Sequence, residues 1–398
     1  MGAAVILFAS SGIAIWLIGV LPLRARYEGQ SRALDVAIAD FHQQRWVRPV
    51  LRGELRDGNA YAAQLSAIGP LRGLPSEALS DAMERMHDGE PPAQEMLSLI
   101  EEHRVHLARY RAATAHRWTW GDYAVEDGIS AVELDYTPHI AATRLLTLMA
   151  STASPDECLR IGADIIRLGQ DRATGRSMIG LMIHDVGVRE IFDRFAQCVL
   201  EAEPEHVRRV ASELAILVEH PAPMGYAMEV EAYYAGATIA QELRPLLQLP
   251  SSGREFEIWW GASDSLEAWA ALADDPVARR QIGEDYPDDI ARYERWAAGL
   301  AASANPLLSI GAPQLGRFLR RNASTRTRVR MLWALARLRS GEPRTVFLDP
   351  LLRDPLTGDP LQTHETSAGL EIQSPGEDGA SGAGDEESDD LALRLPAN

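Results

Sequence analysis

Lysine is absent from this chain of 398 residues, so all 39 of its strongly basic side chains are arginines. Aspartate and glutamate total 57, which gives a formal net charge of −18 at pH 7. Proteins that bind nucleic acids need a cationic surface to displace the counterions of the phosphates. The charge balance therefore argues against a general nucleic-acid-binding role.

Several motifs that mark enzymes are also missing. The sequence has no Gly-x-Ser-x-Gly, P-loop, Gly-x-Gly-x-x-Gly or Cys-x-x-Cys motif. These are local signatures of hydrolases, of nucleotide-binding and dinucleotide-binding proteins, and of thiol redox proteins. No such motif therefore supports hydrolase, nucleotide or redox chemistry.

Cysteine is scarce, and the two that occur, Cys158 and Cys198, cannot build a disulfide framework. They fall on consecutive predicted helices, and we place the turn between these helices near Thr174. Cys158 then lies about sixteen residues before the turn and Cys198 about twenty-four after it, which staggers them by roughly 10 Å at a rise of ~1.5 Å per residue. Because bridging requires Cα atoms within ~7 Å, we expect two free, buried thiols, and the redox compartment stays open.

One uncharged run is long enough to cross a membrane. Ala3 to Leu23 reads AAVILFASSGIAIWLIGVLPL, and a hydrocarbon core of ~30 Å needs about twenty such residues. A cleaved signal peptide would show a basic start and a cleavage site of small residues, and a buried core helix is seldom apolar on all sides at the start of a chain. We therefore predict a single uncleaved transmembrane helix.

Two arguments about the orientation of this span conflict. Arg24, Arg26 and Arg32 follow it and no base precedes it, so the positive-inside rule would keep the body in the cytoplasm. The acidic residues clustered between Glu371 and Asp390 suggest a weak calcium site, which would favour the outside, where calcium is abundant enough to fill it. Because the charge argument depends on only a few residues, we favour a periplasmic, extracytoplasmic body.

The rest of the chain is predicted to be mainly helical. Ser154-Pro155-Asp156-Glu157 is a typical helix start, with an N-cap serine, proline at the first helical position and glutamate at the third. Gly162 with Gly169, and Gly180 with Gly187, are pairs seven residues apart on one helix face; we expect close helix–helix approach to compensate for their helix-weakening effect. Further helices are predicted at Ala93–Ala113, Pro138–Met149, Asp285–Ala302 and Arg326–Arg339.

The predicted organisation thus has three parts. Residues 3–23 form the transmembrane helix, residues 24–345 a multi-helix soluble body, and residues 346–398 a small β-hairpin with an acidic tail. A chain of this length can form one large domain or two of medium size. The fold class is therefore mainly α with a small β element at its end.

One helix face carries two histidines. His103 and His106 are three residues apart and thus share a helix face, Glu102 lies beside them and His116 is near in sequence. Catalytic zinc needs three protein ligands and an open position, and the spacing matches no known zinc motif. A charged, exposed helix face is the alternative to a metal-dependent enzyme. His184 and Asp185 form a second candidate pair. We interpret His184 as a hydrogen-bonded core or boundary histidine rather than a catalytic one.

A cluster of arginines precedes the tail. We interpret it as a solvated helical face with the acidic tail as its counter-charge, and nucleic-acid binding as the minor alternative. Its members are Arg317, Arg320, Arg321, Arg326, Arg328, Arg330, Arg337 and Arg339.

The tail contains the most informative pattern in the chain. Residues 354–361 read DPLTGDPL, residues 372–379 read IQSPGEDG and residues 388–391 read SDDL. We predict a hairpin from Leu361–Thr366 and Leu370–Ser374, turning at Ser367-Ala368-Gly369. Glycine and carboxylates dominate the stretch that follows it.

This pattern resembles the calcium-binding loop of the type II secretion major pseudopilins, over about forty residues. The resemblance implies calcium held by Asp378, Asp389 and Asp390 and a backbone carbonyl near Pro375, with Asp385 as a possible extra ligand. Oxygen donors on a flexible loop suit Ca²⁺. The chain lacks the prepilin motif and has a far longer body, so we infer no pseudopilus.

The layout also resembles a group of uncharacterised bacterial single-span helical proteins that carry a similar tail. We therefore expect a membrane-anchored envelope protein with a structural or interaction role and a structural calcium site in its C-terminal loop, and we favour this over an enzyme. Two alternatives stay open: a metal-dependent enzyme using His103 and His106, and an anchored scaffold whose acidic, Gly/Ser-rich terminus is disordered.

Overall fold

The computed structural model describes residues 21–246 and 315–396, and a few single residues between 264 and 302. Within those ranges it leaves out residues 55, 122–123, 125–135, 176–177, 367–368 and 375–390. Helices dominate the described part, together with two small three-stranded sheets. The predicted mainly helical class is confirmed at this level.

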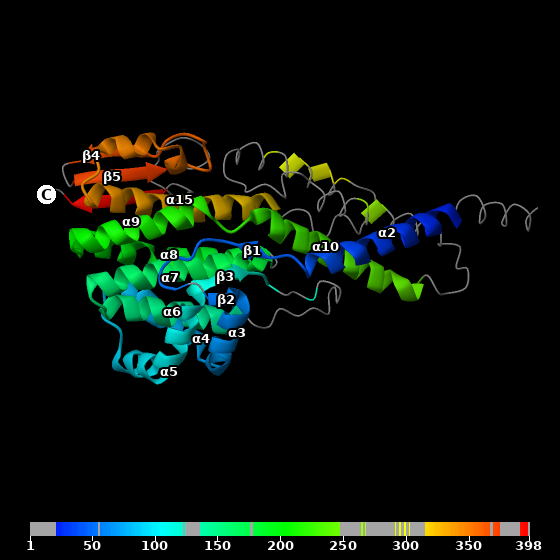
Figure 1. The fold of residues 1–398 in the computed structure, drawn as a ribbon, viewed down its shortest axis with the longest axis horizontal. Helices are drawn as coiled ribbons and strands as arrows, with labels where there is room; N and C mark the ends of the chain where they lie inside the picture. Colours follow the sequence, from blue (N-terminus) through cyan, green and yellow to red (C-terminus); the bar gives the residue numbers. More distant parts are fainter. Residues whose placement is uncertain are drawn as a thin grey trace, which may run out of the picture.

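A bundle of long helices forms the centre of the molecule (Figure 1). Its members are α6 (Tyr136–Thr152), α7 (Pro155–Ala173), α8 (Met178–Glu201), α9 (Pro204–Glu219) and α15 (Leu315–Arg339). Helix α7 is buried on nearly all sides, against α6, α8 and α9. It begins as predicted, because the Ser154 hydroxyl accepts a hydrogen bond from the backbone N–H of Glu157.

A second layer covers one side of this bundle. It contains α3 (Ala60–Ile68), α4 (Ser76–His87) and α5 (Gln94–Ala112), with 3₁₀ turns at Gly69–Leu71 and Ala113–Ala115. Beside it lies a small sheet that was not predicted. Its strands are β1 (Trp46–Val47), β2 (Arg56–Asn59) and β3 (His116–Thr119), in the order β1-β3-β2.

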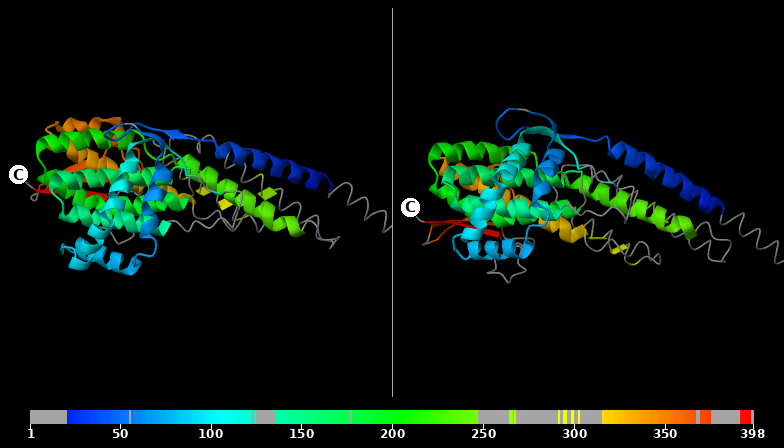
Figure 2. Two further views of the ribbon diagram at one scale, coloured as in Figure 1. Left: turned by 60° about the horizontal axis from the view of Figure 1, so that its bottom comes forward. Right: turned by 90° about the horizontal axis from the view of Figure 1, so that it is seen from below.

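Two helices extend beyond the bundle toward one end of the long axis. Helices α2 (Leu21–Phe41) and α10 (Met224–Leu246) are in contact and project together in all three views (Figures 1 and 2). The Tyr27 hydroxyl donates to the carbonyl of Ala240 at 3.3 Å. At the other end of α2, the fully buried Phe41 ring packs against Trp120 and Tyr233. These contacts fix α2 to the body.

The predicted transmembrane span lies almost wholly outside the described residues, because α2 starts at Leu21. Of the helices that the structure does describe, none is long and apolar enough to cross a membrane. The span at residues 3–23 therefore stays a prediction. The predicted helix at residues 285–302 also lies largely outside the described part.

The C-terminal sheet lies at the end of the long axis opposite the N-terminal end of α2 (Figure 1). Strands β4 (Gln362–Thr366) and β5 (Gly369–Ser374) form the antiparallel hairpin that the sequence predicts, with Thr366 opposite Gly369. A third strand, β6 (Leu391–Pro396), was not predicted and pairs antiparallel with β5. Two 3₁₀ turns, Arg344–Leu348 and Pro350–Leu352, link α15 to this sheet.

Cys158 and Cys198 form a disulfide between α7 and α8, with a Cα–Cα distance of 6.3 Å. Our prediction of two free thiols is therefore wrong. Helix α7 ends at Ala173, Thr174 is extended, and α8 begins only at Met178. Cys158 therefore lies 15 residues before the end of α7 (173 − 158) and Cys198 20 residues after the start of α8 (198 − 178), a smaller stagger than the one we predicted.

Glycines permit the close approach of α7 and α8, as their spacing predicts. A Cβ at Gly162 would overlap the ring of Phe195, and a Cβ at Gly169 would overlap the ring of His184; both rings come from α8. Gly187 in turn faces Thr143 of α6. The missing side chains leave the space that these larger groups fill.

Gly162→Ala is expected to destabilise the protein, although alanine favours helix by about 1 kcal/mol over glycine. The new methyl would displace Phe195 in a packed core, and such overpacking typically costs about 1–3 kcal/mol. Gly29→Ala in α2 is the matched control, because nothing lies within 4 Å of a Cβ there. Thermal melting should show a lower Tm for Gly162→Ala and an equal or higher Tm for Gly29→Ala. A rise for both would contradict the packing argument.

Candidate functional site

The predicted calcium ligands Pro375, Asp378, Asp385, Asp389 and Asp390 all lie outside the described residues. The strands on either side of them are described. Ser374 ends β5, Leu391 begins β6, and these two residues face each other in the antiparallel register. The acidic stretch of residues 375–390 is therefore a connection that leaves the sheet and returns to it at neighbouring positions.

Asp354 is the residue that ties this sheet to the helical bundle. Its side chain is buried, and its Oδ1 accepts from the backbone N–H of Leu356 at 2.9 Å and from the Thr327 hydroxyl of α15 at 3.3 Å. Its Oδ2 accepts from the hydroxyl of Ser374. One carboxylate thus joins the Asp-Pro turn, helix α15 and the strand end from which the acidic stretch departs.

The backbone around Asp354 explains the glycine and second aspartate of the DPLTGDPL motif. The N–H of Gly358 donates to the carbonyl of Asp354 at 2.8 Å, and the N–H of Asp354 donates to the carbonyl of Asp359 at 2.6 Å. Gly358 has φ of 76°, in the left-handed region that favours glycine. Burial raises the pKa of the Asp354 carboxyl above its ordinary value, and the Ser374 hydrogen bond opposes this shift. The motif therefore has a structural role in positioning the sheet.

The two histidines of the predicted metal-binding face do not form a metal site in the described part of the chain. His103 is buried and His106 is half-buried, with ring centroids 6.3 Å apart on α5. His116 lies on β3, in the sheet beyond the end of that helix. Within the described residues there is no group of three or more His, Cys, Asp or Glu side chains that could hold a metal ion.

Several members of the arginine cluster do not lie on the solvated face that we predicted, although Arg339 is exposed. Arg326 and Arg330 are buried, and Arg330 donates to the carbonyl of Arg353. Arg337 binds Asp349 at 2.6 Å and lies over the ring of Trp333. Helix α15 packs against α8 and α9, so these arginines are directed into interfaces. The sequence shows that these residues are basic, but it does not show which residues they contact.

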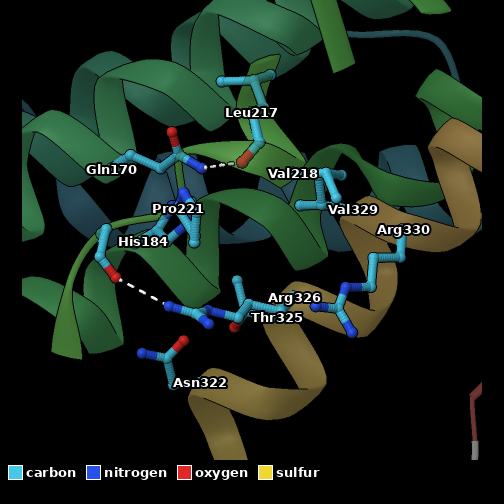
Figure 3. Close-up of a pocket in the computed structure, with 11 residues that line it drawn as sticks. Gln170, His184, Leu217, Val218, Pro221, Asn322, Thr325, Arg326, Val329 and Arg330 are labelled. Carbon is cyan, nitrogen blue, oxygen red and sulfur yellow. Dashed lines mark hydrogen bonds between the residues drawn. The ribbon is translucent and has the colours of Figure 1, made fainter. Parts of the chain in front are cut away.

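A narrow pocket lies where α7, α8 and α15 meet (Figure 3). Its polar lining includes Gln170, His184, Asn322, Arg326 and Arg330. Gln170 donates to the carbonyl of Leu217 at 2.9 Å, and Arg326 donates to the carbonyl of Ala222 at 3.2 Å. The space has room for about one water molecule. It is therefore suited to an internal water and not to an organic ligand.

His184 is the unusual group of this pocket. It is buried, and its Nδ1 has no hydrogen-bond partner among the described residues. Burial lowers the pKa of its imidazole to about 3, and the charges of Arg172 and Arg326 add to this shift. The ring is therefore neutral at physiological pH. The sequence does not indicate that His184 and α15 line one pocket, because Arg326 lies 142 positions after His184 (326 − 184).

The folded protein is expected to lose stability as the pH falls below about 6.5, the unperturbed pKa of histidine. In the unfolded chain His184 then binds a proton, whereas in the folded protein it stays neutral until the pH approaches about 3. Stability therefore rises with pH across this window, by up to about 1.4 kcal/mol per pH unit from this group. Urea unfolding at pH 7, 6 and 5 should show that the free energy of unfolding falls less with decreasing pH in His184→Gln than in the parent. The other titrating groups are common to both proteins, so the difference reports the contribution of His184. Parallel curves would refute the assignment.

A second charged cluster joins α5, α7 and α9. Arg111 binds Asp164 at 2.7 Å, and Arg52 binds Asp164 at 3.1 Å and Glu213 at 2.9 Å. Burial raises the pKa values of Asp164 and Glu213, while the arginines oppose this shift. Each carboxylate already has an arginine partner. We therefore interpret this cluster as a structural ion network rather than an acid–base site.

Comparisons with known proteins place the chain in no family. It matches no protein-family model, no curated protein and no solved structure.

Proposed function

We propose that this protein is a membrane-anchored helical envelope protein with a structural or interaction role, and that residues 375–390 form a calcium-binding loop. The observation that carries the proposal is the pairing of Ser374 with Leu391, which brings both ends of the acidic stretch together. A connection longer than about 12–15 residues is uncommon unless it is functional or disordered.

The composition of this loop supports a hard cation. Residues 375–390 contain seven carboxylates and no arginine. Closing such a loop at its base holds like charges together, and a divalent cation would relieve their repulsion. Asp389 and Asp390 immediately precede β6, so two of the proposed ligands lie next to the paired strands. Calcium takes six to eight oxygen ligands, which aspartates and backbone carbonyls can supply.

The disulfide supports an extracytoplasmic body. Disulfides persist in oxidising compartments such as the periplasm and are rare in the cytosol. The Cys158–Cys198 bridge therefore adds to the calcium argument and opposes the positive-inside argument from Arg24 and its neighbours. With the anchor at the N-terminal side of α2, the C-terminal sheet would lie at the end of the molecule away from the membrane (Figure 1).

The test is a calcium titration of the full chain in a non-ionic detergent, followed by thermal melting and limited proteolysis. For a site with Kd of about 10⁻³ M, ~10 mM calcium should add roughly 1.4 kcal/mol of stability. For a chain of 398 residues this corresponds to a rise in Tm of about 1–2 °C. The tail should also become protected from protease. The triple variant Asp378→Ala/Asp389→Ala/Asp390→Ala should lose both effects.

Glu365→Ala is the control, because it removes a carboxylate from the exposed face of β4 outside the proposed loop. It should keep the calcium response of the parent. Equal trimming of the tail with and without calcium would support a disordered acidic terminus instead. A calcium response that survives in the triple variant would place the ion elsewhere and overturn the proposed site.

A further inference from the structure

A groove runs along α8 between the loop after α4 and the C-terminal sheet. Two hollows make up this groove, one against residues 86–92 and one against β6, and both are lined by Asp193 and Gln197 of α8. Their volumes are about 500 and 370 Å³, within the range of pockets that bind ligands, about 300–1,000 Å³. The groove does not involve the proposed calcium loop or its ligands.

The wall of the groove on the sheet side is the edge of β6. Three consecutive residues, Ala392, Leu393 and Arg394, line it. Successive side chains of a strand point to opposite faces. Because all three residues line the hollow, the hollow lies along the edge of the strand and not over one of its faces. The sheet order is β4-β5-β6, and on its other side β6 pairs with no strand in the described part of the chain. Such an edge offers backbone N–H and C=O groups to an incoming strand.

The opposite wall is one face of α8 and is acidic at its centre. Asp193 is exposed, and although Arg328 is close enough to interact with its charge, no hydrogen bond or salt bridge joins Asp193 to a residue that the structure describes. In Glu190, Oε1 accepts from Arg144 at 3.0 Å, whereas Oε2 is buried without a described partner. Burial raises the pKa of Glu190. These carboxylates would gain from a cation in the groove.

The basic side chains of the lining are His87, Arg194 and Arg394; His87 lies near Glu190, and the two arginines have the carboxylate partners Glu201 and Glu371. Arg194 donates to Gln197 at 2.9 Å, and Arg394 pairs across the sheet with Glu371 at 3.5 Å. The carboxylates of the lining, Glu90, Glu190 and Asp193, outnumber these two arginines, so the lining favours a cation. A helix face on one side and a strand edge on the other leave a channel whose shape suits an extended chain.

We propose that this groove binds an extended, basic peptide segment of a partner protein. The segment adds as a strand to the free edge of β6, and an arginine or lysine side chain reaches Asp193 and Glu190. Backbone pairing supplies the affinity in this mode of recognition, and side-chain contacts supply the specificity. Because the chain contains no lysine and has a net charge of −18, a cationic segment is also attracted over longer distances.

The test uses the full chain in a non-ionic detergent and a fluorescein-labelled peptide in which threonine and arginine alternate over six residues. Threonine favours an extended backbone. Fluorescence anisotropy should show saturable binding, and hydrogen exchange should slow in the amides of residues 391–396. Asp193→Arg should weaken binding by about tenfold, equivalent to ~1.4 kcal/mol. A peptide with glutamate in place of arginine should not bind.

Asp81→Arg on α4 is the matched control, since Asp81 is also an exposed helical aspartate. It changes the net charge equally but lies outside the groove lining. Equal weakening by Asp81→Arg and Asp193→Arg would show general charge attraction and overturn the proposal. The proposal would also be overturned if the peptide protected only amides outside residues 391–396, or if the arginine peptide did not bind. Unchanged melting of both variants establishes that they are folded.

Discussion

Replacing Asp171 with alanine is expected to lower the free energy of unfolding by about 3–5 kcal/mol, the usual cost of breaking a buried ion pair from one side. Asp171 of α7 holds the guanidinium of Arg48 through two hydrogen bonds, of 2.6 and 2.5 Å, and neither side chain is exposed to solvent. Arg48 also donates to the carbonyl of His116 at 3.0 Å. The pair therefore joins β3 and the segment after β1 to the central helix.

The effect should be large because Asp171 neutralises more than one arginine. Arg167 lies one turn earlier on α7, is fully buried, and donates to the carbonyl of Pro49. Burial lowers the pKa of Arg167 to about 9, the charge of Arg48 adds to this shift, and Asp171 opposes it. Removing Asp171 would leave two buried guanidinium groups near each other without this carboxylate.

Urea unfolding followed by far-UV circular dichroism is the measurement. The double variant Arg48→Met/Asp171→Leu should recover much of the lost stability, because an apolar pair of similar size avoids burying an unpaired charge. Asp81→Ala, on the exposed face of α4, should change stability by no more than about 0.5 kcal/mol. A loss below about 1 kcal/mol in Asp171→Ala would show that water reaches Arg48 in the folded protein.

The sequence predicts those parts of the fold that depend on short-range patterns. Ser154 and Glu157 mark the start of α7 because an N-cap and its hydrogen bond involve residues three apart. The hairpin of β4 and β5 could be placed because its strands are separated by a short turn. The glycines of α7 indicate close packing, although the partner rings of Phe195 and His184 could not be predicted.

Other parts depend on contacts between distant residues. Strand β1 pairs with β3 across about seventy positions of sequence, and strands of two to four residues leave no periodic signal. Strand β6 follows an acidic stretch that reads as a tail, so its pairing with β5 was missed. Asp164 and Asp171 of α7 are charged residues that lie in the interior of the molecule. They are buried because arginines from other segments, Arg48, Arg52 and Arg111, reach them.

Reducing the Cys158–Cys198 disulfide is expected to lower the free energy of unfolding by about 4 kcal/mol. The two cysteines are 40 residues apart in sequence, and chain-entropy arguments give about this value for a closed loop of that length. Both side chains are fully buried, so a reductant reaches the bridge mainly through unfolding. Urea titration with and without dithiothreitol should therefore be carried to equilibrium. The variant Cys158→Ala/Cys198→Ala should be less stable than the oxidised parent and insensitive to the reductant.

The redox state of this disulfide in cells would show on which side of the membrane the body lies. Cells quenched in acid can be treated with a maleimide polymer that adds mass to free thiols, before and after reduction. If the body lies in an oxidising compartment, the parent chain should shift only after reduction, and each single variant, Cys158→Ala or Cys198→Ala, should shift without it. Reactive thiols in the parent chain would place the body in a reducing compartment. The positive-inside argument from Arg24, Arg26 and Arg32 would then hold, and a weak calcium site would lack the extracytoplasmic calcium that it needs.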